Sequence, residues 1–231
     1  MSVQRSVEDP TDSHEINTQV TLGLLEAARA NDVRVVWASS AAIYGHLESI
    51  PTSETHPKEP TSPYGLDKLT IDHYARLYSE LYGLEAIPLR YFNVYGPGQV
   101  AGDYSGVISV FIEQALSGED ISVHGDGEQT HDFVYVDDVV RANCAAATTD
   151  LVGNPYNVGT GESTSIRELA EEIQEITDTR SDIVHTDVRS GDIDHSKADI
   201  TRMRDQLEVE PTVSLREGLE HTIEWYRESR M

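Results

Sequence analysis

A tyrosine and a lysine four positions apart are the residues of this chain whose types and spacing could do chemistry. Tyr64 and Lys68 lie in the segment 62–68, where Ser62 and Pro63 are a favourable helix N-cap and first helical residue. Side chains four positions apart on a helix share one face, so we expect the ammonium to lie beside the phenol. A nearby positive charge favours the phenolate, and lowering a phenol pKa from about 10 toward neutrality corresponds to roughly 4 kcal/mol. Tyr64 could then act as a general base, although an amphipathic helix could also carry the pair without any function.

Two serines occupy a second position where chemistry is possible. The segment 33–39 is rich in β-branched and aromatic residues and predicts a buried strand, so Ser39 and Ser40 would lie at its carboxyl end. A hydroxyl there could hydrogen-bond a substrate hydroxyl and the tyrosine together. A serine-rich turn between strand and loop would explain the same residues without a function.

The elements that must position these residues alternate between helix and strand. The hydrophobic periodicity predicts helices over 13–30, from 63 onward, over 105–116 and 139–147, and from the capping boxes that begin at 165 and 214. It predicts strands over 33–39, 84–91, 121–124, 132–136, 154–158 and 183–188. This alternation favours an α/β fold with a mainly parallel, doubly wound sheet, in which ligands bind outside the carboxyl ends of the strands.

Composition and charge exclude several classes of protein. The 231 residues include 41 acidic and 17 basic side chains, a formal charge of -24, which argues against nucleic acid or an anionic membrane as the main partner. Lysine occurs only at Lys58, Lys68 and Lys197, and the acidic residues are spread along the whole chain. This composition resembles the acidic, lysine-poor surfaces of proteins from a high-salt cytoplasm, so we expect a halophilic protein.

The remaining composition predicts a soluble cytoplasmic protein without a structural metal. Cys144 is the only cysteine, which excludes an intramolecular disulfide and fits a reducing cytoplasm. The segment 1–10 is charged and unlike a signal peptide, and no apolar run is long enough to span a bilayer. The nine histidines show no metal-ligand spacing, so we expect no metal site.

Several motifs in a fixed order resemble a known family. Ser-Ser-x-x-x-Tyr-Gly at 39–45 and a proline-rich loop precede Ser-Pro-Tyr-Gly-x-x-Lys at 62–68, and Arg-Tyr-Phe-Asn-Val-Tyr-Gly-Pro follows at 90–97. With 125–138 and 189–192, this order resembles the extended short-chain dehydrogenase/reductase family, closest to its UDP-glucose 4-epimerase branch. The resemblance covers essentially the whole chain. It implies an NAD-dependent homodimer that interconverts the C4 configuration of UDP-hexoses through a 4-keto intermediate.

The resemblance also implies a domain organisation and a role for individual residues. Residues 1–98 would form the C-terminal half of a Rossmann-like NAD-binding domain with the catalytic residues, and 99–231 mainly the nucleotide-sugar-binding part, with some segments returning to the sheet. Ser40 would bridge sugar and base, Tyr64 would be the base, and Lys68 would bind the nicotinamide ribose and lower the tyrosine pKa. Ser39, Tyr91 and Phe92 would contact the cofactor. The substrate would be bound by Asn93 and His131 at the diphosphate, Val123 along the uracil, Arg189 and Asp192 at phosphate and ribose, and Ser196 as a gate over the sugar's 2-substituent.

Three departures from the family pattern leave a second reading open. The family's glycine-rich phosphate loop is absent, so we expect about half of the nucleotide-binding domain to be missing, either from a fragment or from a truncated gene. His131 replaces an arginine, and Ala41-Ala42 stand where dehydratases and decarboxylases carry acids, which argues against dehydration. The alternative function is a non-catalytic remnant that binds nucleotide sugar or a partner chain. Arg90 could supply positive charge for the diphosphate or form a structural ion pair.

Overall fold

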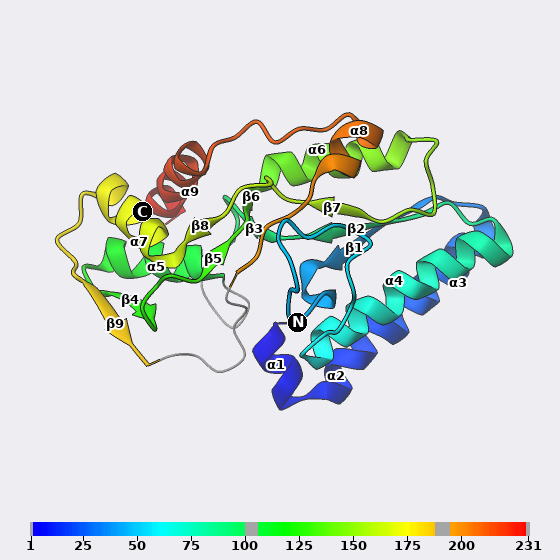
Figure 1. Ribbon diagram of the computed structural model, residues 1–231, viewed down its shortest axis with the longest axis horizontal. Coiled ribbons are helices and arrows are strands. Elements are labelled where there is room, and N and C mark those ends of the chain that lie inside the picture. The colour runs from blue at the N-terminus through cyan, green and yellow to red at the C-terminus, as the bar shows by residue number, and fades with distance from the viewer. Residues whose placement is uncertain (1, 100–105, 188–194, 230–231) are drawn as a thin grey trace.

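The structure, a computed structural model, describes residues 2–99, 106–187 and 195–229 (Figure 1). Three parallel strands form its central sheet in the order β1-β2-β7, with bounds β1 (Val35–Ser40), β2 (Ala86–Tyr91) and β7 (Tyr156–Val158). The middle strand β2 is buried along nearly its whole length, as expected for a parallel strand covered on both faces. Ser40 is opposite Tyr91, and Tyr91 is opposite Val158, so the carboxyl ends of the three strands lie together.

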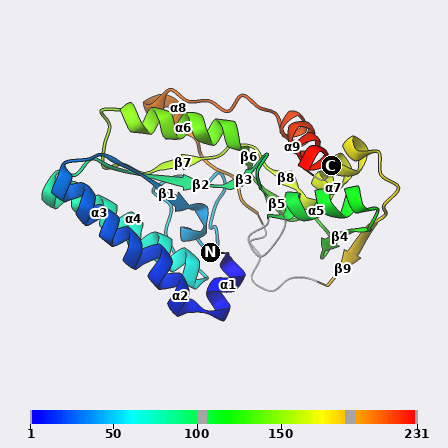
Figure 2. The same cartoon turned by 180° about the vertical axis from the view of Figure 1, so that it is seen from behind.

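Helices cover both faces of this sheet (Figures 1 and 2). One face carries α3 (Val20–Asn31) and α4 (Pro63–Tyr82), and the other carries α6 (Val136–Thr148) and α8 (Thr201–Leu207). On the first face, Leu25 of α3 and Ala75 of α4 pack into one buried cluster. On the second, Ala142 of α6 and Met203 of α8 pack into another. A parallel sheet between two layers of helices confirms the α/β class predicted from the sequence.

A second group of elements lies beyond the carboxyl ends of the central strands (Figure 1). Its helices are α5 (Val107–Ser117), α7 (Ile166–Thr177) and α9 (Leu215–Ser229). Its strands form the parallel pairs β3 (Asn93–Tyr95) with β6 (Phe133–Tyr135) and β4 (Ile121–His124) with β9 (Ile183–Thr186), and the antiparallel pair β5 (Thr130–His131) with β8 (Thr164–Ser165). Ile112, Leu169 and Ile223, one from each helix, are buried in a common core.

The N-terminal helical segment begins earlier and is less regular than the sequence predicts. The periodicity predicts one helix over 13–30, whereas the structure has α1 (Val3–Glu8), α2 (Pro10–His14), the π-helical turn η1 (Glu15–Gln19) and then α3. Asp9 caps α2 by accepting a hydrogen bond from the Asp12 amide, and Pro10 occupies the first helical position. This start signal precedes the apolar periodicity, which is why periodicity alone places the helix start too late.

Helix caps predicted from the sequence occur where they were expected. The Ser62 hydroxyl accepts a hydrogen bond from the Gly65 amide at 3.1 Å and starts α4, which ends at Gly83 in the left-handed conformation. Ser165 and Glu168 form both hydrogen bonds of a capping box at the start of α7. At the start of α9, the Ser214 hydroxyl accepts from the Glu217 amide at 3.3 Å. A short 3-10 turn, η2 (Ala41–Ile43), follows β1 directly.

The described residues show neither a membrane-spanning helix nor a cluster of metal ligands. Over residues 2–99, 106–187 and 195–229, none of the helices combines the length and apolar character needed to cross a membrane. The same ranges contain no group of three or more histidine, cysteine or acidic side chains arranged to hold a metal ion.

Thermal stability is expected to rise with KCl concentration, from dilute buffer to molar salt. Acidic residues outnumber basic ones by 41 to 17, so one basic side chain can pair with several carboxylates. The Arg216 guanidinium, for example, contacts the carboxylates of Glu172, Glu175 and Glu220. Self-repulsion at a formal charge of -24 destabilises the folded state at low ionic strength, and added salt screens it. Melting curves across the series measure this effect. A melting temperature that is flat or falls with KCl would contradict the expected halophilic behaviour.

Candidate active site

A cavity of about 550 Å³ lies at the carboxyl ends of β1 and β2. Its walls come from both parts of the chain: β1, η2, the start of α4 and the end of β2 on one side, and β3, β4, β5 and α5 on the other. Of the site residues expected from the sequence, seven line it: Ser40, Tyr64, Tyr91, Phe92, Asn93, His131 and Ser196. The fold therefore brings together side chains that are up to 156 positions apart, counting from Ser40 to Ser196.

Tyr64 and Ser40 meet at the sheet end of the cavity. The Tyr64 phenol lies close enough to the Ser40 hydroxyl for that hydroxyl to lower its pKa, and the Ser40 hydroxyl also accepts a hydrogen bond from the Ala42 amide at 3.2 Å. Gly65 allows this approach, because a Cβ at that position would lie 2.6 Å from the Ala42 carbonyl oxygen. The first turn of α4 is thereby held against η2, and the phenol and the serine hydroxyl face the same ligand space.

Lys68 lies beside Tyr64, one helical turn further along α4. Its ammonium donates a hydrogen bond to the Ala38 carbonyl at 2.9 Å and lies over the rings of Tyr64 and Trp37, at 5.6 and 5.3 Å from their centroids. Burial lowers the pKa of Lys68, and the neighbouring Asp67 carboxylate opposes that shift. The helix predicted from the sequence therefore places the two side chains together.

The pKa of Tyr64 does not shift in the direction expected for an activated base. Burial raises the pKa of this phenol above its ordinary value of 10, and the nearby Ser40 hydroxyl opposes the rise only in part. Burial removes water from the phenolate and so disfavours it. The Lys68 ammonium does not offset this effect, because it binds a main-chain carbonyl and lies over the ring face. Further positive charge near the hydroxyl is needed to stabilise the phenolate at neutral pH.

The residues next to Tyr64 fit the nicotinamide end of a dinucleotide. Tyr91 and Phe92 line the cavity at the end of β2, and the Tyr91 hydroxyl is held by Asn143 at 2.9 Å. The Ser39 hydroxyl is buried without a hydrogen-bond partner, so a polar ligand atom could satisfy it. Ser39 does not line the cavity, and its side chain alternates with that of Ser40 along β1. Tyr91 and Phe92 are therefore the residues of this group that could contact a nicotinamide ring from within the cavity, whereas Ser39 does not reach it.

The opposite wall combines polar groups that are suited to a substrate. The amide nitrogen and the side-chain amide of Asn93 both donate to the Asp132 carbonyl oxygen, at 3.0 and 3.2 Å. Ser196 is 7% exposed, and its amide donates to the Thr130 carbonyl at 2.8 Å. His131 lines the cavity between these two segments. The main chain thus fixes the positions from which these side chains could contact a ligand.

Val123 does not fit its expected role, because its side chain faces away from the cavity. It is fully buried in the core formed by α5, α7 and α9, whereas the neighbouring Ser122 and His124 line the cavity. Successive side chains of a strand point to opposite faces, so β4 presents Ser122 and His124 to the cavity in place of Val123. Gln99 and Gln129 also line the cavity and were not expected from the sequence. Arg189 and Asp192, expected at the phosphate and ribose, lie outside the described residues.

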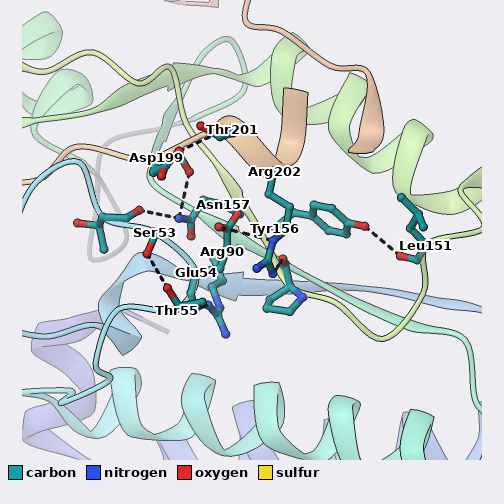
Figure 3. Close-up of polar contacts among 12 residues, drawn as sticks. Ser53, Glu54, Thr55, Arg90, Leu151, Tyr156, Asn157, Asp199, Thr201 and Arg202 are labelled. Atoms are coloured by element: carbon teal, nitrogen blue, oxygen red, sulfur yellow. Dashed lines mark hydrogen bonds and ion pairs between the residues drawn. The ribbon is translucent and has the colours of Figure 1, made fainter. Parts of the chain in front are cut away.

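Arg90 has a structural role in place of the phosphate contact considered from the sequence. Figure 3 shows Arg90 together with Glu54, whose carbonyl oxygen it binds. It is 3% exposed and does not line the cavity. Its guanidinium pairs with the buried Asp72 carboxylate, with Nε donating at 3.1 Å, and also donates to the Tyr44 hydroxyl and the Glu54 carbonyl. Burial raises the pKa of Tyr44 to about 12, so its hydroxyl stays protonated and donates to Asn157 at 2.6 Å. This network joins β2, α4, β7 and the loop before α4 beneath the cavity.

Comparisons with known proteins give a consistent picture. Residues 1–159 match the model of the NAD dependent epimerase/dehydratase family. Over 229 residues the chain is 39% identical to the UDP-glucose 4-epimerase of Mycolicibacterium smegmatis, covering 98% of this chain and 73% of that protein.

Two solved structures extend this similarity to the whole fold. The UDP-glucose 4-epimerase of Thermotoga maritima, crystallised with UDP-glucose, is 39% identical and superposes with a TM-score of 0.96 over 100% of this chain and 75% of its own. The Thermus thermophilus UDP-glucose 4-epimerase in complex with NAD is 36% identical, with a TM-score of 0.90 over 98% of this chain and 74% of its own. This likeness confirms the expected Rossmann-type fold. The chain spans about three quarters of the length of these relatives.

Proposed function

The chain belongs to the NAD-dependent epimerase/dehydratase family, and on that premise we propose that it interconverts the C4 configuration of UDP-hexoses through a 4-keto sugar. The observation that carries the proposal is the placement of Ser40, Tyr64 and Lys68 together at the end of β1, with Ser40 and Tyr64 lining the cavity. NAD is the cofactor of this family.

In the proposed mechanism, Tyr64 moves the proton of the sugar's C4 hydroxyl and Ser40 orients that hydroxyl. The Ser40 hydroxyl and the Tyr64 phenol lie near each other and both line the cavity, so a substrate hydroxyl bound beside them could contact both. Bound NAD supplies the oxidation and reduction at C4 and a positive charge that favours the Tyr64 phenolate. Lys68 contributes a second positive charge beside the ring and is positioned to bind the nicotinamide ribose.

The wall opposite Tyr64 is proposed to bind the UDP part of the substrate. Asn93 and His131 are assigned to the diphosphate, and Ser122 and His124 to the nucleotide in place of Val123. A histidine is at most partly charged at neutral pH and cannot make the bidentate contact of a guanidinium. The diphosphate contact at His131 is therefore weaker than an arginine would give.

The direct test is turnover of UDP-glucose to UDP-galactose, followed by NMR with and without added NAD. We expect product to form and the rate to depend on NAD. Calorimetric titration with UDP-glucose separates the alternative function, because a non-catalytic remnant would bind the nucleotide sugar without converting it. Absence of both turnover and binding would contradict the proposal and leave, of its alternative, only a remnant that binds a partner chain.

Ser196→Tyr is expected to abolish selectively any activity on UDP-N-acetylhexosamines. Ser196 lines the cavity and is assigned to the space around the sugar's 2-substituent, where a small side chain leaves room for an acetamido group. A phenol ring in that space would overpack against the acetamido group, at a cost of about 1 to 3 kcal/mol or more, and spare the plain hexoses. Assays of both substrate pairs on wild type and variant measure this selectivity. Equal loss on both pairs would show that Ser196 is not the gate.

A further inference from the structure

Asp132 is a buried carboxylate between two residues that line the cavity. It lies between β5 and β6, is 0% exposed, and is flanked by His131 and Phe133. A carboxylate in such a place is costly unless hydrogen bonds compensate for its lost hydration. Its partners therefore show what the residue holds in place.

The carboxylate accepts four hydrogen bonds from two separate segments. Oδ1 accepts from the amide and the hydroxyl of Thr160, both at 2.7 Å. Oδ2 accepts from the Gly161 amide and from the Ala198 amide, both at 3.0 Å. All four donors are uncharged, and three of them are main-chain amides. Asp132 thus joins the turn after β7 to the segment that contains Ser196.

The main chain around Asp132 also holds the wall of the cavity that lies opposite Tyr64. Its carbonyl oxygen accepts both hydrogen bonds of Asn93, and two residues earlier the Thr130 carbonyl accepts from the Ser196 amide. Asn93 and Ser196 both line the cavity, on different segments. One residue and its close neighbour therefore position two side chains assigned to the substrate.

The packing around the carboxylate leaves no room for adjustment. A Cβ at Gly159 would lie 2.9 Å from Asp132 Oδ2 and 2.8 Å from the Ala198 Cβ, so glycine is required where the turn passes this point. An asparagine at 132 would have nearly the same shape but would direct an NH2 group at one pair of these donors. The arrangement accordingly selects a carboxylate by hydrogen-bond type as well as by size.

We infer that Asp132 is a positioning residue that sets the spacing between Asn93 and Ser196 on the wall opposite Tyr64, and through it the affinity for a nucleotide sugar. The four hydrogen bonds of the Asp132 carboxylate are called the clamp below. The effect on affinity rests on the proposed function, whereas the clamp itself does not. Without the carboxylate, the 195–199 segment loses the side-chain contact that holds the Ala198 amide, and Ser196 shifts relative to Asn93.

The test compares Asp132→Asn with Asp138→Asn. Asp138 is the control, because it is also buried and its carboxylate binds Arg141, Thr212 and Val213, none of which lies in the 195–199 segment or lines the cavity. Hydrogen exchange of a peptide covering 195–199 should be about tenfold faster in Asp132→Asn and unchanged in Asp138→Asn, since only the former loses a hydrogen bond to this segment. If Asp132→Asn does not fold, Thr160→Val removes one of the four donors and should raise the exchange by about threefold.

Calorimetric titration with UDP-glucose gives the second readout. We expect binding about tenfold weaker in Asp132→Asn, because Ser196 is no longer fixed relative to Asn93, and within about twofold of wild type in Asp138→Asn. Unchanged exchange at 195–199 in Asp132→Asn, or equal acceleration in both variants, would overturn the inference. Faster exchange together with a wild type that does not bind UDP-glucose would uphold the clamp and contradict the proposed function. Faster exchange with unchanged affinity would overturn the link from the clamp to the substrate.

Discussion

Tyr64→Phe is expected to lower the turnover number for UDP-hexose epimerisation by about a thousandfold while the protein stays folded. A positioned general acid or base contributes about 10² to 10⁴ in rate, and this substitution removes only the hydroxyl that exchanges the proton. The ring and its contact with the Lys68 ammonium are kept. Rates are measured by NMR at saturating substrate, with melting temperatures as the check on folding.

Tyr74→Phe is the matched control for this substitution. Tyr74 lies on the same helix, ten positions further along, and packs in the core between α3 and α4. Its loss of a hydroxyl should leave turnover within about twofold of wild type, since the residue is remote from the reacting atoms. If the turnover number of Tyr64→Phe stays within about tenfold of wild type, a difference of roughly 1.4 kcal/mol in activation free energy, Tyr64 is not the base.

The pH dependence of turnover gives a further signature of the same base. Because the phenol must be ionised to accept a proton, the rate should be high above its pKa and fall as the pH drops through it. Burial raises the pKa of Tyr64 in this structure, so positive charge from the bound cofactor must lower it again. The limb of the pH–rate profile where turnover falls with decreasing pH then lies closer to neutrality. This limb should be absent from the residual activity of Tyr64→Phe.

Arg90→Met is expected to destabilise the fold by about 3 to 5 kcal/mol, because it leaves the Asp72 carboxylate buried without its partner. Oδ1 of Asp72 already has no hydrogen-bond partner, and Oδ2 depends on the Arg90 guanidinium. The Tyr44 hydroxyl and the Glu54 carbonyl would each lose a donor as well. Urea unfolding monitored by circular dichroism measures the change in the free energy of unfolding.

Two further variants make this result specific to the buried pair. Arg76→Met removes an exposed ion pair with Glu80 on α4 and should cost less than about 1 kcal/mol. Adding Asp72→Leu to Arg90→Met should recover part of the loss, because the unpaired buried charge is then gone. If Arg90→Met and Arg76→Met have equal effects, the Arg90 network does not stabilise the fold as argued.

The local signals in the sequence predicted helix α4 well. Ser62 and Pro63 start α4, and the four-residue spacing brings Lys68 beside Tyr64, because these features depend only on the helix itself. The position of Ser40 in the cavity was also predictable, because ligands of an α/β fold bind at the carboxyl ends of its parallel strands.

One misplacement could have been avoided from the sequence. Ile121 and Val123 are apolar and alternate with Ser122 and His124, so the two-residue period of a strand predicts that Val123 faces the core. The expectation for Val123 came from the resemblance to the family, which placed the whole strand along the nucleotide. The alternation of polarity should have taken precedence for the side chain.

Other features depend on contacts between distant parts of the chain. Arg90 pairs with Asp72 across 18 positions, and local sequence could not distinguish a buried ion pair from a phosphate contact. Asp132 binds donors that lie 28 to 66 positions away, so its role appears only once β7 and the 195–199 segment are folded around it. The raised pKa of Tyr64 likewise reflects burial, which the spacing of Tyr64 and Lys68 does not reveal.

The most direct measurement follows the atoms at C4 of the sugar. UDP-glucose carrying deuterium at C4 is incubated with the protein and NAD, and the product is analysed by NMR and mass spectrometry. The account predicts UDP-galactose that keeps its deuterium at C4, because oxidation and reduction supplied by bound NAD would not exchange this atom with solvent. Absence of UDP-galactose, or UDP-galactose that has exchanged the deuterium for solvent hydrogen, would contradict it.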